Sequence, residues 1–116
     1  MARAATTTDA FNAVAEPRRR LILDALVGGE QPVNDLVETL GLAQPQVSKH
    51  LRVLREVGAV EVRSSGRQRL YRVNAAALRP IHDWVKSYEH AWTQRFERLD
   101  TVLEELKKEE GDARDD

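Results

Sequence analysis

Residues 33–60 have the apolar periodicity of two short amphipathic helices joined by a tight turn. The apolar positions are Leu36, Val37 and Leu40 in the first helix, and Val47, Leu51 and Leu54 in the second. Gly41 follows the first helix at the place where a left-handed C-terminal residue is favoured. Two helices that pack against each other through such a turn form a helix-turn-helix unit, and this segment predicts one.

The second helix leaves polar and cationic side chains on its outer face. These outward residues are Gln44, Gln46, Ser48, Lys49, Arg52 and Arg55. In a helix-turn-helix protein the second helix enters the DNA major groove and uses its N-terminal residues on base edges. The pattern therefore indicates a DNA-binding regulator that reads sequence from this helix.

The net charge of −1 hides an uneven distribution along the chain. Residues 42–73 carry seven basic and two acidic residues, whereas residues 80–116 carry six basic and eleven acidic ones. Salt confines the influence of a charged patch to about 8–10 Å, so the local sign matters more than the total. A window of this size can be basic by chance, but its overlap with the helix-turn-helix favours a nucleic-acid partner.

An alternating segment follows Gly58 and predicts a β-hairpin, in the place where a winged helix carries its wing. Val60 and Val62 alternate with Glu61 and Arg63, and a second alternating strand begins at Gln68 after the turn Ser64–Arg67. The polar residues of this wing are Arg63, Arg67, Gln68 and Arg69. We expect them to contact phosphates or the minor groove; the alternative is that they only protect an exposed strand edge.

A short helix after Asp9 and a second helix from Pro17 to about Val27 precede the helix-turn-helix. The three arginines at 18–20 stand at a helix N-terminus, where the helix dipole disfavours cations. These arginines could lie on a solvated helix face or contact phosphate, or another interaction could require them there. Residues 1–8 have no periodicity, and we expect a flexible N-terminal arm there.

From Pro80 to about Leu106 apolar residues recur every three or four positions, which predicts one long helix. Its apolar stripe includes Trp84, Tyr88, Trp92, Phe96, Leu99 and Leu103. A winged helix of about 70 residues cannot cover the whole stripe, so we expect a second copy to pack on it as a homodimer. The aromatic residues could instead line a pocket for an apolar ligand, and the first turns could fold back on their own domain.

The chain resembles the ArsR/SmtB-type winged-helix repressors over about residues 9–106. The segments that carry the resemblance are AEPRRRLILDAL at 15–26, LGLAQPQVSKHLRVLREVGAV at 40–60 and VRSSGRQRLYRV at 62–73. The resemblance implies a dimeric repressor that binds a near-palindromic double-stranded DNA operator. By the same resemblance, Gln44, Gln46, Ser48 and Lys49 lie toward the major groove, Arg52 lies toward phosphate, and Arg67 and Arg69 lie on the wing. We expect His50 to be packed in the protein or to face phosphate.

Two positions depart from what the family commonly has. Ala43 stands where the second helix usually starts with a Ser cap, and such a cap typically contributes about 1 kcal/mol. Pro32 and Asn34 stand where metal-responsive members often carry a cysteine pair, and the chain has no cysteine. His82, Asp83 and His90 offer only a weak intersubunit alternative, so we expect neither a metal site nor a cofactor, and the effector stays unknown.

These observations predict a mainly α fold with a β-hairpin wing, in the order α-α-α-α-β-β-α. We assign residues 9–79 to the DNA-binding domain, 80–106 to the dimerisation helix and 107–116 to a disordered acidic tail. Neither a nucleophile motif nor a phosphate loop indicates an enzyme, and no apolar run indicates a membrane span. We therefore expect a soluble, cytoplasmic, non-enzymatic repressor that could regulate its own gene. The alternative is a winged helix that binds proteins without sequence-specific DNA binding.

Overall fold

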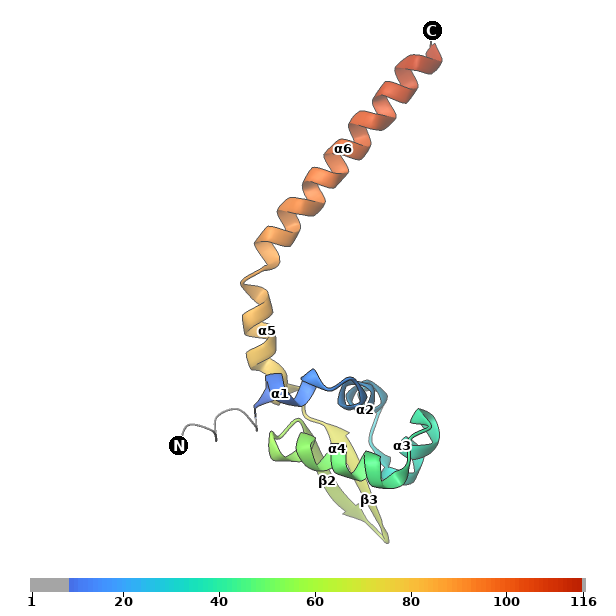
Figure 1. Cartoon of the computed structure of the whole chain (residues 1–116), viewed down its shortest axis with the longest axis vertical. Coiled ribbons are helices and arrows are strands. Elements are labelled where there is room, and N and C mark those ends of the chain that lie inside the picture. The colour runs from blue at the N-terminus through green and yellow to red at the C-terminus, as the bar shows by residue number, and fades with distance from the viewer. Residues whose placement is uncertain (1–8, 116) are drawn as a thin grey trace. The chain divides into compact units, whose positions relative to one another are not determined.

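The computed structural model describes residues 9–115, and for residues 112–115 it describes the backbone alone. The chain forms two compact units, one up to Ile81 and one from His82 onward (Figure 1). The helices of the first unit are α1 (Ala10–Ala15), α2 (Pro17–Val27), α3 (Val33–Leu40), α4 (Gln44–Glu56) and the short 3-10 helix η2 (Ala75–Leu78). Its strands are β1 (Gln31–Pro32), β2 (Val60–Ser65) and β3 (Gln68–Val73). The predicted helix-turn-helix and the wing that follows it are both present.

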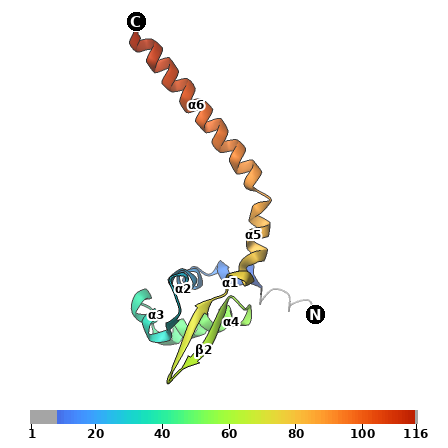
Figure 2. The ribbon, with the colours of Figure 1, turned by 180° about the vertical axis from the view of Figure 1, so that it is seen from behind.

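The three strands form one antiparallel sheet in the order β1-β3-β2. The hairpin of β2 and β3 extends past the helices of the first unit (Figure 2). β2 and β3 pair from Val60↔Val73 to Ser65↔Gln68 through a two-residue turn. Gly66 takes the first position of that turn with a φ of 63°, as glycine-first hairpin turns require. β1 pairs with β3 at Gln31↔Tyr71 and was not predicted, because a two-residue strand that ends in proline has no alternation to detect.

Two helix ends follow from the local chemistry of a single residue. Asp9 caps α1, since its Oδ1 accepts a hydrogen bond from the Asn12 backbone N–H at 2.7 Å. Gly41 ends α3 with a φ of 66°, and its N–H donates to the Val37 carbonyl at 2.9 Å. Both features are as the sequence predicts, and Gly41 begins the turn that leads from α3 to α4.

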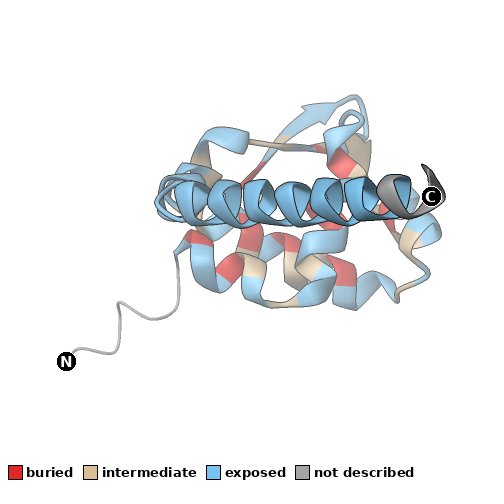
Figure 3. Ribbon diagram, turned by 90° about the horizontal axis from the view of Figure 1, so that it is seen from above, coloured by how far each residue is buried: buried red, intermediate tan, exposed pale blue. Residues whose placement is uncertain are grey.

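The core of the first unit lies between its helices and the inner face of the sheet (Figure 3). The fully buried large side chains are Ile22, Leu26, Leu36, Val47, Leu51 and Leu54. They include the predicted inward positions of α4 and the central position of α3. Val60 and Tyr71 close the core from the sheet, so the wing and α4 are held by the same apolar cluster.

The second unit differs from the single helix that the sequence predicted. It contains α5 (Arg79–Lys86) from His82 onward and α6 (Glu89–Asp115), and a turn at Ser87 and Tyr88 separates the two helices. In this turn the Ser87 hydroxyl donates to the Trp84 carbonyl at 2.7 Å, and the Tyr88 N–H donates to the Val85 carbonyl at 2.9 Å. A serine that bonds to nearby backbone offers an alternative to the regular helix, which is a physical reason for the break.

α6 also continues to Asp115, where we expected a disordered tail after Leu106. Residues 107–110 are two lysines followed by two glutamates. Both residue types have high helix propensity, and they can form ion pairs at three- and four-residue spacing. Acidic composition alone was therefore a poor guide to this segment. In the described part of the chain, no helix combines the length and the apolar character that a membrane crossing needs.

Candidate nucleic-acid interface

α4 is amphipathic along its whole length. Val47, Leu51 and Leu54 are buried at helical spacing, and this fixes which face the helix turns to solvent. The predicted outward residues Gln44, Gln46, Lys49 and Arg52 are exposed, and Ser48 and His50 are half-buried. The sequence thus predicts the orientation of the helix correctly, because the apolar stripe leaves one face free.

The first turn of α4 is capped by a glutamine in place of the usual serine. Ala43 has no side-chain acceptor, but Oε1 of Gln46 accepts a hydrogen bond from the Ala43 backbone N–H at 3.2 Å. This is half of a capping box, the half that a glutamine at the third helical position supplies. One turn along the outer face, Gln44 Nε2 donates to Ser48 Oγ at 2.9 Å. Three of the four predicted base-contacting residues are therefore held in a defined arrangement within α4.

Strand alternation places the wing residues on two different faces. Arg69 shares a face with the buried Tyr71, and its guanidinium carbon lies 6.0 Å from the Tyr71 ring centroid. Arg63 pairs with Leu70 across the hairpin and lies on the other face. Of the four predicted wing residues, Arg67, Gln68 and Arg69 gather near the end of the hairpin, and Arg63 lies apart from them.

These three wing residues meet the start of α4 around a polar hollow of about 360 Å³. Its lining comes from β1 and α3 (Pro32, Val33, Asn34), from α4 (Gln44, Ser48) and from the wing (Arg67, Gln68, Arg69, Tyr71). Five of the residues predicted to bind DNA therefore lie at one place, although they are up to 25 positions apart in the sequence. Two arginines face amide and hydroxyl groups there, which is a chemistry suited to phosphate and base edges.

Arg63 forms a forked ion pair with Glu30, which lies just before β1. Its Nε is 2.9 Å from Glu30 Oε2 and 3.1 Å from Oε1, and Nη2 also contacts Oε1. Because Arg63 donates these hydrogen bonds, the pKa of Glu30 is lowered and the pKa of Arg63 is raised. The pair links two segments 33 residues apart and neutralises the charge that we expected Arg63 to offer to DNA.

His50 lies on the side of α4 near the start of α2. Its Nδ1 is buried, and among the described residues it has no hydrogen-bond partner. Burial lowers the pKa of His50, the charge of Glu16 opposes this shift, and the charge of Arg19 adds to it. A contact from His50 to phosphate would therefore be made mainly by the neutral ring at neutral pH.

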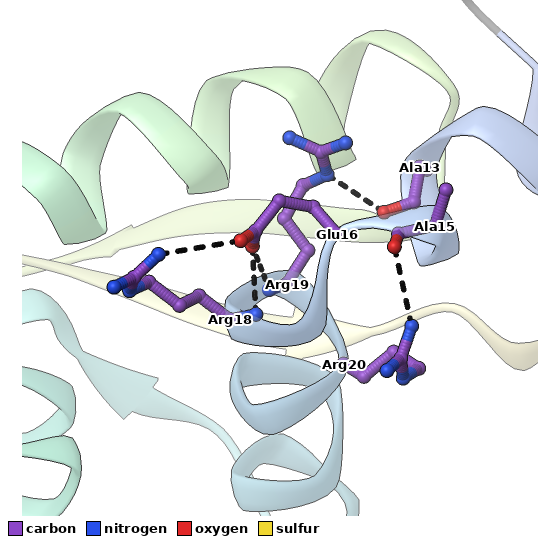
Figure 4. Close-up of polar contacts among 6 residues, drawn as sticks. All are labelled: Ala13, Ala15, Glu16, Arg18, Arg19 and Arg20. Atoms are coloured by element: carbon purple, nitrogen blue, oxygen red, sulfur yellow. Dashed lines mark hydrogen bonds and ion pairs between the residues drawn. The ribbon is translucent and has the colours of Figure 1, made fainter.

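The arginine run at 18–20 has a structural role that the sequence left open (Figure 4). Arg19 donates to the carbonyls of Asn12 and Ala13 at 3.1 and 2.7 Å. Arg20 donates to the carbonyls of Val14 and Ala15 at 2.6 and 3.4 Å. The last four carbonyls of a helix have no partner within it, and these two side chains satisfy all four in α1.

Glu16 resolves the dipole conflict at the start of α2. Its Oε2 accepts the backbone N–H groups of Arg18 and Arg19 at 2.7 and 3.3 Å, and its Oε1 lies 3.4 Å from the Arg18 guanidinium (Figure 4). The N-terminus of α2 thus carries a carboxylate, as a helix dipole favours. Arg18 and Arg20 are exposed to solvent, whereas Arg19 is half-buried.

An exposed apolar stripe occupies α5 and α6 in the second unit. The predicted interface residues Trp84, Tyr88, Trp92, Phe96, Leu99 and Leu103 are all between 46% and 65% exposed in the single chain. The ring centroids of Trp84 and Tyr88 are 5.5 Å apart, and those of Tyr88 and Trp92 are 6.4 Å apart. So many large exposed apolar groups along one segment are typical of an interaction surface.

Comparison with known proteins agrees with this architecture. Residues 16–62 match the model of the bacterial regulatory protein arsR family. The transcriptional repressor SdpR of Bacillus subtilis is 30% identical over 78 residues, which cover 67% of this chain and 87% of SdpR. The chain belongs to the ArsR family. The resemblance seen in the sequence is thereby confirmed.

Two further relatives support the assignment of this ArsR-family protein. The regulator NmtR of Mycobacterium tuberculosis is 43% identical over 68 residues, which cover 59% of this chain and 57% of NmtR. A solved structure described as a possible transcriptional regulator for arsenical resistance is 40% identical, with a TM-score of 0.60. The match covers 66% of this chain and 83% of the solved chain. This likeness establishes the winged-helix fold.

Proposed function

We propose that this ArsR-family regulator is a homodimeric repressor that binds a near-palindromic DNA operator through α4 and the wing. The observation that carries the proposal is the polar hollow between the first turn of α4 and β3. It gathers two arginines, three amide side chains and two hydroxyl-bearing residues beside an exposed helix face. An acidic partner with hydrogen-bonding edges, such as duplex DNA, matches this chemistry.

Each group has a role that follows from its chemistry. Gln44, Gln46, Ser48 and Lys49 are assigned to base edges in the major groove. A glutamine can pair with adenine through two hydrogen bonds, and a lysine favours the O6 and N7 acceptors of guanine. Arg52 and His50 are assigned to phosphates, and Arg67, Gln68 and Arg69 to phosphates or the minor groove beside the wing. Arg63 is assigned to orient the wing, since Glu30 occupies its guanidinium.

The dimer follows from the stripe on α5 and α6, which a second copy would cover. A two-fold axis would present two α4 helices to half-sites one helical turn of DNA apart, and so favour a near-palindromic site. In this proposal residues 9–79 form the DNA-binding domain, and residues 80–106 form the dimerisation segment. We further propose that the repressor binds upstream of its own gene.

The test is to select bound sequences from a random duplex library and then measure affinities by fluorescence anisotropy. Lys49→Ala should change the preferred base at one position of each half-site, at a cost of about 1–3 kcal/mol of discrimination. Arg67→Ala should weaken binding to all duplexes alike and reduce the log–log salt slope by about one per contact. Arg98→Ala, on α6, is a control with the same loss of charge and should leave both quantities unchanged.

Two results would contradict the proposal. If the wild-type chain binds specific and random duplexes equally, α4 does not read bases. If it binds no duplex at low salt, the alternative of a winged helix that binds proteins is favoured.

A further inference from the structure

The polar hollow between β3 and the first turn of α4 is lined by hydrogen-bond donors and by no carboxylate. Seven of the nine described residues around it carry a side-chain N–H or O–H group, and none of the nine is acidic. The seven are Asn34, Gln44, Ser48, Arg67, Gln68, Arg69 and Tyr71. Two of them are arginines, whose guanidinium groups stay charged in proteins. A surface of this composition suits an anion that accepts several hydrogen bonds at once.

The donors of the wing and of α3 have no partner within the part of the chain that the structure describes. The side chains of Asn34, Arg67 and Gln68 make no hydrogen bond or ion pair there. The guanidinium carbon of Arg69 lies 6.0 Å from the Tyr71 ring centroid, and this contact leaves the guanidinium N–H groups unpaired. The hollow therefore holds two positive charges that no carboxylate of its lining balances.

The first turn of α4 presents a further donor to the hollow. Gln44 Nε2 donates a hydrogen bond to Ser48 Oγ at 2.9 Å. Because this bond uses a lone pair of the serine oxygen, the hydroxyl hydrogen of Ser48 stays available for an acceptor. An oxyanion between β3 and α4 would thus meet donors on both sides.

We propose that the hollow binds a small phosphate monoester, which competes there with the DNA backbone and so releases the operator. This ligand rests on the DNA binding proposed above and adds a regulatory site to it. A phosphate monoester carries a charge of about −1.5 to −2 at pH 7, whereas each phosphodiester of DNA carries one negative charge. The two unbalanced guanidinium groups therefore match a free monoester more closely than a backbone phosphate. Each guanidinium group can also bind two phosphate oxygens through parallel N–H bonds.

The hollow has room for more than a phosphate group. Its volume of about 360 Å³ lies within the range of small-molecule sites, which is about 300–1,000 Å³. Beside the donors, Pro32 and Val33 contribute apolar side chains to the lining. These side chains suit the carbon-bearing part of an ester. The ligand class is thus a small organic phosphate.

Competition follows because the ligand and the DNA need the same side chains. Gln44 and Ser48 are assigned above to base edges, and Arg67 and Arg69 to phosphates or the minor groove. A bound monoester would occupy these donors and place negative charge where the DNA backbone approaches. Occupancy by one therefore excludes the other. At a ligand concentration about nine times its own dissociation constant, the apparent dissociation constant of the operator should rise about tenfold.

Amide NMR of the full-length chain without DNA tests the site itself. The probes are methyl phosphate, which is a monoester, and dimethyl phosphate, a diester that imitates the DNA backbone; sodium chloride at the same ionic strength is the blank. Methyl phosphate should give saturable shifts at the amides of Arg67, Gln68 and Arg69. Its dissociation constant should be at least about tenfold lower than that of dimethyl phosphate, because it carries the larger charge. Equal affinities for the two probes, or no saturable shift, would overturn the ligand site.

A charge placed in the lining tests the assignment to this hollow. Asn34→Asp adds a carboxylate at nearly constant volume and should weaken the binding of methyl phosphate at least about tenfold. Asn12→Asp makes the same change at an exposed position of α1, outside the hollow, and should leave the binding unchanged. Equal losses in the two variants would show an effect of net charge alone and would overturn the site. Far-UV circular dichroism establishes that both variants are folded.

Fluorescence anisotropy with a duplex from the selected library tests the regulation. At constant ionic strength, methyl phosphate should weaken duplex binding by the wild-type chain and have little effect on binding by Asn34→Asp. An unchanged affinity for the duplex while the hollow is occupied would overturn the competition. A wild-type chain that binds no duplex would instead contradict the proposed DNA binding, and the NMR titration would still decide whether the hollow binds the monoester.

Discussion

At the scale of single residues, the side chain of Gln46 has one role in the free protein and a second role in the proposed DNA complex. In the free protein it caps α4 in place of the absent serine, since its Oε1 accepts the Ala43 N–H. In the proposed complex it also faces the major groove. A DNA phosphate at the helix N-terminus could take over the cap, because that end of a helix is a natural anion site.

Substitutions at Gln46 separate the two tasks. Gln46→Glu keeps an acceptor for the Ala43 N–H, so the free energy of unfolding should stay within about 0.5 kcal/mol of the wild-type value. Gln46→Ala removes the acceptor and should cost about 0.5–1 kcal/mol. Both variants should lose operator affinity, because neither side chain can donate to adenine. Urea denaturation and anisotropy measure the two effects. A loss of stability in the Glu variant as large as in the Ala variant would refute the capping role.

His50 makes stability depend on pH in a defined direction. Its folded pKa is lowered from the ordinary value of 6.5, chiefly by burial, so the unfolded chain binds the proton more tightly. The contribution is therefore fully present above pH 6.5 and is lost as pH falls through 6.5 toward the folded pKa. His50→Gln should flatten the unfolding free energy between pH 7 and pH 5, and His90→Gln, at an exposed site, should not. The same slope in both variants would show that another group is responsible.

At the scale of elements, the wing is held by two kinds of contact on its two faces. Its inner face shares Val60 and Tyr71 with the core, whereas its outer face is tied to the body through the Glu30–Arg63 pair. The side chains of this pair are 31% and 54% exposed, so we expect it to contribute little to global stability. Its effect lies in the direction in which the wing carries Arg67 and Arg69.

A charge exchange tests whether Arg63 orients the wing or contacts DNA. Arg63→Glu and Glu30→Arg should each weaken operator binding about three- to tenfold, with unfolding changed by less than about 1 kcal/mol. The double variant Glu30→Arg/Arg63→Glu restores the pair with reversed polarity and should recover most of the affinity. Binding of the double variant that is as weak as that of Arg63→Glu alone would show that Arg63 contacts DNA directly. Anisotropy and urea denaturation provide both measurements.

At the scale of the whole molecule, folding and assembly rest on different parts of the chain. All the buried hydrophobic residues in the described part lie between Ala10 and Tyr71, within the first unit. The second unit has its large apolar groups exposed. Assembly can therefore be lost without the loss of the winged-helix core.

A single charged residue placed in the apolar stripe should abolish assembly and leave the winged-helix core folded. Leu99→Asp would bury two carboxylates at the proposed dimer interface, and we expect a monomer that keeps its helical circular dichroism spectrum. Its operator affinity should fall at least a hundredfold, because each monomer then binds one half-site without its linked neighbour. Thr101→Asp is the control on the outer face. A Leu99→Asp variant that sediments as a dimer would contradict the assigned surface. Sedimentation velocity and anisotropy are the measurements.

The spacing of apolar residues in the sequence was enough to predict the features that depend only on residues close together in the chain. The stripe of Val47, Leu51 and Leu54 predicted which face of α4 is free, and Gly41 predicted where α3 ends. Both predictions hold because an amphipathic helix must bury its apolar face whatever it packs on. The alternation from Val60 onward likewise predicted the wing, and it also placed Arg63 opposite the face that Val60 and Val62 share.

The tertiary structure decided which distant residues meet. Three features depend on how segments far apart in the sequence pack together, and no local pattern predicts them. They are the pairing of Glu30 with Arg63, the strand β1, and the hollow lined by Gln44 and Arg69. The arginine run at 18–20 makes the same point, because its carbonyl partners belong to the preceding helix. The helix-turn-helix and the apolar stripe can thus be predicted from the sequence alone, because the local spacing of apolar residues determines them. The partners of the charged residues come from the fold, because long-range packing selects them.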